Sequence, residues 1–221
     1  MVITYYGLSC FKVQSGDQTI IFDPPSKDSD LNPPRFETHV ALSSHNHPLH
    51  NGIKDLPGKK ESGPFLISGP GEYEIEDLSV TGLNSFHDSS QGKERGRNTI
   101  YVVEMENMRL CHLGDFGEKE LSAENEEAMG EIDVLFVPVG GKDVIDPEEA
   151  VKIISELEPK IAIPMHYAIS KTPIKGAKIE EFLKEWGEEK ISPEDKFTFK
   201  KKDLPEDGTK LVVLSPTISI S

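Results

Sequence analysis

The feature that most constrains the fold of this chain is a change of pattern between its two halves. The first half consists of short runs of β-branched and aromatic residues separated by turn residues, which is typical of strands joined by tight connections. Turns are expected at Ser15-Gly16-Asp17, Gly69-Pro70-Gly71 and Glu106-Asn107, and Pro24 and Pro25 end a strand because proline cannot donate to a ladder. The expected strands lie at residues 2–6, 10–14, 19–23, 40–44, 65–68, 78–83, 99–105 and 109–113.

The second half alternates strands with helices. Residues 133–139 are almost continuously apolar, as in a buried strand. Asp146, Pro147 and Glu149 then supply a helix N-cap, a proline at the first helical position and a capping box. A second helix has apolar residues at helical spacing from Ile179 and ends at Gly187. Strands are expected at 160–164, 197–200 and 210–214, and an acidic helix or loop at 118–131. Residues 1–221 are therefore interpreted as one α/β domain.

Charge and hydropathy exclude several classes of partner. The 221 residues contain 24 Lys and Arg against 39 Asp and Glu, giving a net charge of −15, which argues against a nucleic-acid or anionic-lipid partner. No stretch reaches the roughly 18–20 apolar residues of a membrane-spanning helix, and the first residues lack the basic flank of a signal peptide. Cys10 and Cys111 lie in apolar runs, as buried thiols do in a reducing compartment. We expect a cytoplasmic protein with a small-molecule substrate, and the sequence is compatible with a homo-oligomer.

Three of the seven histidines gather in the segment Ser44-His45-Asn46-His47-Pro48-Leu49-His50, directly after an expected strand. In an extended chain the side chains of residues i and i+2 point the same way, so His45 and His47 are expected to chelate one ion. The chain then turns, which places His50 at a neighbouring position. Neutral imidazoles are natural ligands of borderline-soft divalent ions, so this segment is interpreted as a metal site.

Further histidines follow strand ends, where loops converge in α/β sheets: Phe86-His87-Asp88, His112-Leu113-Gly114-Asp115 and Ile163-Pro164-Met165-His166-Tyr167. Together with the clustered histidines, these segments resemble the metallo-β-lactamase superfamily, whose hallmarks are His-x-His-x-Asp-His, a single His, a Gly-Asp and a final His. With Pro138-Val139-Gly140-Gly141, they look most like the branch that contains L-ascorbate 6-phosphate lactonase. The resemblance implies a four-layered αββα sandwich with metal at one edge of the two sheets.

The resemblance also assigns roles to residues. It implies His45, His47 and His87 as ligands of a first metal ion, His50 and His166 as ligands of a second, and Asp115 as the carboxylate that bridges them. Asp115 would in addition orient the attacking water or accept its proton.

The chain departs from the family pattern at one position. The family has an aspartate where this chain has Leu49, which offers no lone pair. One or two divalent ions are therefore expected, with water, Asp88 or Glu72 as replacement ligands. Imidazole and carboxylate donors favour zinc or manganese, with iron or nickel as alternatives.

Other residues are expected to support the site. His112 is interpreted as a supporting residue, and Asp23 either fixes the tautomer of a ligand histidine or only ends a strand. The loop at residues 92–98 carries Lys93, Arg95 and Arg97 in an acidic chain. These cations either attract an anionic substrate or keep a strand edge solvated.

The sequence therefore predicts a metal-dependent hydrolase. It would use a metal-activated water on a small anionic ester, lactone or phosphodiester. The alternative is a non-catalytic metal- or ligand-binding protein on the same fold, a hypothesis suggested by Leu49. A nuclease of the same superfamily is disfavoured, because the acidic chain has no length left for a nucleic-acid-binding domain.

Overall fold

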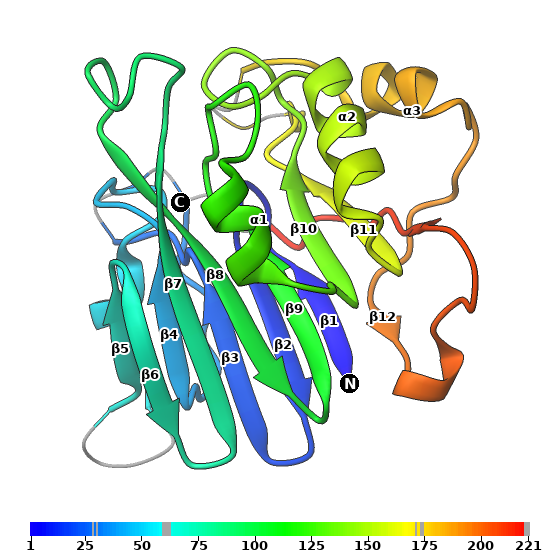
Figure 1. The fold of residues 1–221 in the computed structure, drawn as a ribbon. Helices are drawn as coiled ribbons and strands as arrows, with labels where there is room; N and C mark the ends of the chain where they lie inside the picture. Colours follow the sequence, from blue (N-terminus) through cyan, green and yellow to red (C-terminus); the bar gives the residue numbers. More distant parts are fainter. Residues whose placement is uncertain (28, 30, 59–62, 171, 173–174, 219–221) are drawn as a thin grey trace.

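Two mixed β-sheets lie face to face in the computed structural model, which describes residues 1–27, 29, 31–58, 63–170, 172 and 175–218 (Figure 1). The six-stranded sheet has the order β12-β1-β2-β3-β4-β5 and the seven-stranded sheet the order β13-β11-β10-β9-β8-β7-β6. The first sheet consists of β1 (Val2–Tyr5), β2 (Phe11–Ser15), β3 (Gln18–Phe22), β4 (Val40–Ser43), β5 (Phe65–Ser68) and β12 (Phe197–Thr198). The second consists of β6 (Gly71–Ile75), β7 (Leu78–Phe86), β8 (Arg97–Met105), β9 (Met108–His112), β10 (Val134–Pro138), β11 (Ile161–Met165) and β13 (Lys210–Leu211).

Strand direction brings distant segments to one edge of the seven-stranded sheet. β9, β10 and β11 pair in parallel, so their C-terminal ends lie on the same side. β7 pairs antiparallel with β8, and β8 antiparallel with β9, so β7 runs in the same direction as β9. The loops that follow β7, β9 and β11 therefore start at a common edge.

The core between the sheets follows from the alternation of side chains along each strand. In β3 and β4, Ile20, Phe22, Val40 and Leu42 belong to the main core, whereas Ile21 and Ala41 belong to a second cluster with Ile53 and Leu56. Aromatic rings from both sheets meet inside the main core. The Phe136 ring lies 4.5 Å from that of Phe11 and 5.9 Å from that of Phe22.

The outer layers of the two sheets differ. α1 (Ala123–Met129) contacts β7, α2 (Pro147–Leu157) contacts β10, and α3 (Ile179–Trp186) packs on α2 (Figure 1). The second cluster is covered by the 3-10 helix η1 (Gly52–Asp55), not by an α-helix. The sandwich of two sheets is confirmed, and in the described residues the layer over the six-stranded sheet is reduced to this short helix. None of the described helices is long and apolar enough to cross a membrane.

Several expected boundaries differ from the structure. The predicted capping box of α2 is present, with the Asp146 side chain accepting from the Glu149 N–H. β6, which begins at Gly71, was missed because this edge strand exposes Glu72 and Glu74 and lacks an apolar run. The strands expected at 197–200 and 210–214 end at Thr198 and Leu211, and residues 201–203 form the 3-10 helix η2 (Lys201–Asp203).

The aromatic cluster predicts a large difference between two phenylalanines. Replacement of the fully buried Phe136 by alanine should lower the free energy of unfolding by about 3–5 kcal/mol, because it removes contacts and leaves a cavity between the sheets. Phe65→Ala is the matched control, since this ring is 48% exposed on the edge strand β5, and it should change stability by less than about 1 kcal/mol. Urea unfolding followed by circular dichroism measures both. Equal losses would contradict the assignment of Phe136 to the core.

Candidate metal centre

A single carboxylate oxygen lies at the centre of the site. Oδ2 of Asp115 lies 3.2 Å from Nε2 of His166, 3.3 Å from that of His50, 3.5 Å from that of His87 and 3.8 Å from that of His45. These residues come from the loops after β4, β7, β9 and β11, so both sheets contribute. They form two groups, His45 with His87 and Asp115, and His50 with Asp115 and His166.

The donor atoms fit a divalent ion. Nε2 of His45, Nδ1 of His50 and Nε2 of His87 are buried and have no hydrogen-bond partner. Buried polar atoms are ordinarily paired, so the unpaired Nε2 atoms of His45 and His87, which face Oδ2 of Asp115, are suited to ligate a cation. His50 faces the same oxygen through Nε2, whereas its unpaired Nδ1 lies 3.8 Å from Oδ2 of Asp23. Ligands held tetrahedrally at about 2.0–2.1 Å from zinc lie about 3.3 Å apart, which is close to the separations around Asp115. Each group also leaves coordination positions open.

Burial sets the protonation states of the site. It lowers the pKa of His45 and of His50 to about 4, against the raising effect of Asp115, so both imidazoles are neutral with a lone pair to offer at pH 7. Burial alone would raise the pKa of the Asp115 carboxyl, but the His166, His50 and His45 imidazoles hold it well below its usual range. A charged carboxylate beside the neutral imidazoles of His45 and His50 is a site for a cation.

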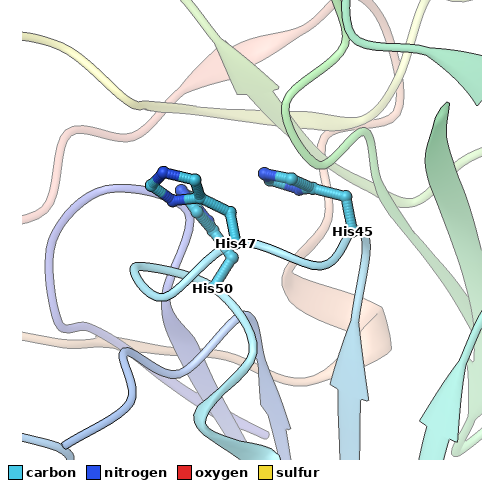
Figure 2. Close-up of side chains that lie close together, drawn as sticks. All are labelled: His45, His47 and His50. Atoms are coloured by element: carbon cyan, nitrogen blue, oxygen red, sulfur yellow. The ribbon is translucent and has the colours of Figure 1, made fainter. Parts of the chain in front are cut away.

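The chain already bends between His45 and His47, where an extended segment was expected. β4 ends at Ser43, and the His45 carbonyl accepts from the His47 N–H at 3.1 Å. The turn expected before His50 is present, because the His47 carbonyl accepts from the N–H groups of His50 and Asn51. The rings of His45, His47 and His50 nevertheless rise from one side of this loop (Figure 2). His47 is exposed and groups with His45 and His50, whereas the expected trio of His45, His47 and His87 does not form a group.

Three supporting side chains hold Asp115 in place. The Ser9 hydroxyl donates to Asp115 Oδ1 at 2.7 Å, and the Asp115 N–H donates to Oδ1 of Asn98 at 3.0 Å. His112 accepts from the Gly114 N–H through Nδ1, which leaves its Nε2–H to donate to the Ser9 carbonyl at 2.8 Å. His112 thus lies behind the turn that carries Asp115 and contacts its neighbours Ser9 and Gly114. Ser9 and Asn98 were missed, because neither belongs to a motif in the sequence.

Asp23 supports the histidine loop from below. Its carboxylate accepts from the Ser44 N–H at 2.6 Å and from the Ser44 hydroxyl at 2.7 Å, and the Ser44 oxygen lies 3.0 Å from Nδ1 of His45. Oδ2 of Asp23 also lies 3.8 Å from Nδ1 of His50. Asp23 therefore fixes the loop that carries His45 and His50, and it does so through Ser44.

A pocket of about 540 Å³ opens over Asp115 and its histidines, lined also by Leu8, Leu49, Arg95, Lys142 and Lys175. Of the three cations expected beside the site, only Arg95 lines this pocket, where it pairs with Asp143 at 2.8 Å. Arg97 lies on β8 and lines a different groove, and Lys93 lines neither. Lys142 and Lys175 were missed, because they lie in loops far from the histidine motifs.

The two carboxylates considered as replacements for the family aspartate lie elsewhere. Asp88 accepts from the backbone N–H groups of Ser90, Gly92, Glu94 and Arg95, so it folds its own loop. Glu72 lies on the edge strand β6 and belongs to none of the groups able to hold a metal. Leu49 packs beside Leu8 and Leu31 and forms an apolar wall.

Fold and site together define a protein of the metallo-β-lactamase class. The family model described as "Beta-lactamase superfamily domain" matches residues 2–166, and the chain belongs to this family. A UPF0173 metal-dependent hydrolase of Pyrococcus furiosus is 34% identical over 213 residues, which cover 84% of this chain and 92% of that protein. A UPF0173 metal-dependent hydrolase of Thermococcus onnurineus is 28% identical over 206 residues, which cover 82% of this chain and 90% of that protein. A solved structure from Thermotoga maritima, described as a candidate Zn-dependent hydrolase of the metallo-β-lactamase superfamily, has a TM-score of 0.76 at 31% identity and covers 96% of this chain and 97% of that chain.

The buried imidazoles predict a stability that falls in acid when no metal is bound. In the unfolded chain His45 and His50 take up a proton near pH 6.5, whereas in the folded chain they remain neutral down to about pH 4. Acidification from pH 6.5 to 4 therefore favours the unfolded state, by up to about 1.4 kcal/mol per pH unit for each histidine. His166, whose pKa is raised, acts in the opposite direction at higher pH, because it adds stability as the pH falls toward 6.5.

Urea unfolding of chelator-treated protein at pH 7.5 and pH 5 measures the effect. The comparison variant is His45→Gln/His50→Gln, which should lose less stability over the same interval. A loss as large as that of the unchanged chain would show that the titrating groups lie elsewhere.

Proposed function

We propose that this protein is a metal-dependent hydrolase that acts on a small anionic ester, lactone or phosphodiester. The observation that carries the proposal is the arrangement of His45, His50, His87 and His166 around one oxygen of Asp115 at the base of an open pocket. Membership of the metallo-β-lactamase family and relatives named metal-dependent hydrolases support it. Nothing among the described residues favours a non-catalytic binding protein.

In this proposal, each of the two groups that share Asp115 holds one divalent ion. His45, His87 and Asp115 would hold one divalent ion and His50, Asp115 and His166 another, with zinc or manganese as the ions that suit these donors. A bound ion supplies a water of lowered pKa and polarises the substrate oxygen under attack. Oδ1 of Asp115 is engaged by Ser9, so Oδ2 is the atom left to orient the water and to accept its proton.

The pocket wall determines what the site accepts. Lys142 and Lys175 would bind the anionic part of a substrate, with Arg95 held beside them by Asp143. Leu8 and Leu49 give the same pocket an apolar side that excludes water from the reacting bond. In a chain of net charge −15, these cations also draw anions toward the site.

Loss of the central carboxylate should remove activity without unfolding the chain. Asp115→Asn removes the shared charge and the proton acceptor, so kcat should fall by about 10²–10⁴-fold. The test uses zinc- or manganese-loaded protein on a panel of nitrophenyl esters, lactones and bis(nitrophenyl) phosphate, with metal content measured in parallel. Asp207→Asn, an exposed carboxylate outside the pocket, is the control and should retain activity. No turnover by the wild-type protein, or equal turnover by Asp115→Asn, would contradict the proposal.

The two lysines should affect binding of charged substrates only. Lys142→Gln/Lys175→Gln should raise KM about tenfold for an anionic substrate and leave KM for an uncharged ester unchanged, because charge-assisted hydrogen bonds are lost. Lys184→Gln/Lys190→Gln changes the net charge equally at exposed positions outside the pocket. An equal rise for both substrates would assign the lysines to folding and not to recognition.

A further inference from the structure

A second groove lies against the metal pocket. It has a volume of about 610 Å³ and shares three lining residues, His45, Asn46 and Arg95, with that pocket. The histidine loop after β4 and the loop before β8 thus form a common wall between the two spaces. A ligand in this groove would lie beside the residues that are proposed to hold the metal.

The charge of the groove is opposite to that of the chain. Lys54, Arg95 and Arg97 line it, and none of the described residues that line it is Asp or Glu. Arg95 is neutralised by Asp143, but Lys54 and Arg97 form no ion pair in the part of the chain that the structure describes. Two unpaired cations without a carboxylate, in a protein of net charge −15, make a local site for an anion.

The donors are held by ordered elements. Arg97 is the first residue of β8 and pairs with Phe86 of β7, and Lys54 lies in η1. Asn51 donates to Oδ1 of Asn46 at 2.6 Å, and both residues line the groove. Arg95 follows the turn that the Asp88 carboxylate closes. These elements fix the backbone positions from which the cationic side chains line one groove.

We propose that the groove lined by Lys54 and Arg97 is an anion-binding subsite that takes a second negatively charged group, a phosphate or a carboxylate, of the substrate. Its role as a substrate subsite rests on the proposed function, whereas its binding of an anion does not. The substrate class is thereby narrowed to molecules that carry two anionic groups.

Calorimetric titration of the metal-loaded protein with inorganic phosphate tests the anion site without turnover. The wild-type chain should bind phosphate in the groove as well as in the metal pocket. Lys54→Gln/Arg97→Gln should weaken the groove site at least about tenfold, since charge-assisted hydrogen bonds are removed, while Lys142→Gln/Lys175→Gln should weaken only the other site. The control Lys184→Gln/Lys190→Gln has the same net charge and should bind like wild type. Phosphate binding by Lys54→Gln/Arg97→Gln that equals the control would overturn the proposal.

Kinetic measurements then show whether the anion bound in the groove is part of the substrate or is free phosphate. The substrates are nitrophenyl esters that carry either one or two phosphate groups. Lys54→Gln/Arg97→Gln should raise KM only for the ester with two phosphate groups. An unchanged KM for both esters, with phosphate binding to the groove lost, would overturn the subsite role and assign the groove to free phosphate. If the protein turns over no substrate, the proposed function fails, and the calorimetric result still decides whether the groove binds an anion.

Discussion

The structure depends on one buried negative charge, the carboxylate of Asp115. It is only 2% exposed, and burial of an ion costs several kcal/mol unless partners compensate for it. The Ser9 hydroxyl donates to the Asp115 side chain, and the Asp115 backbone N–H donates to Oδ1 of Asn98. His166, whose pKa Asp115 raises against the effect of burial, lies 3.2 Å away, but the imidazoles of His45 and His50 are neutral at pH 7 and supply no positive charge. Asp23, the other buried carboxylate below the loop, increases the local negative charge. A divalent cation between these groups would satisfy the unpaired nitrogens and the carboxylate at once.

The position of Asp115 also connects the site to the core. His112, at the end of β9, stacks on Phe22 of the opposite sheet with the ring centroids 4.7 Å apart, and Phe22 is part of the cluster around Phe136. Gly114 has a φ of +61°, and a Cβ there would lie 2.4 Å from Oδ1 of Asn98. The turn that presents Asp115 therefore requires a glycine and the packed faces of both sheets. The contacts that pack the two sheets together therefore also position Asp115.

The sequence revealed the parts of this site that lie in motifs, and it missed those that depend on tertiary structure. Strand ends followed by His45, His87, Asp115 and His166 were predictable, because each follows an apolar run. Ser9, Asn98 and Lys175 carry no local signal, since their roles arise only when loops far apart in the chain meet. The bend after Ser43 could not be predicted from the spacing, and it groups His47 with both His45 and His50. Strand β6 escaped prediction for a similar reason, because a solvated edge strand needs no apolar pattern.

Leu49 determines how open the centre is. A structural zinc site is closed by four protein ligands, whereas a catalytic site keeps at least one position for water or substrate. Here the two groups share Asp115 and contain three residues each, and the place where the family has a carboxylate is taken by a side chain that packs on Leu8 and Leu31. Leu49 thus provides no metal ligand and instead forms an apolar wall of the pocket beside the free coordination positions. An arrangement with fewer protein ligands, free coordination positions and a pocket above them is suited to binding and polarising a substrate, and it is poorly suited to holding a metal only for stability.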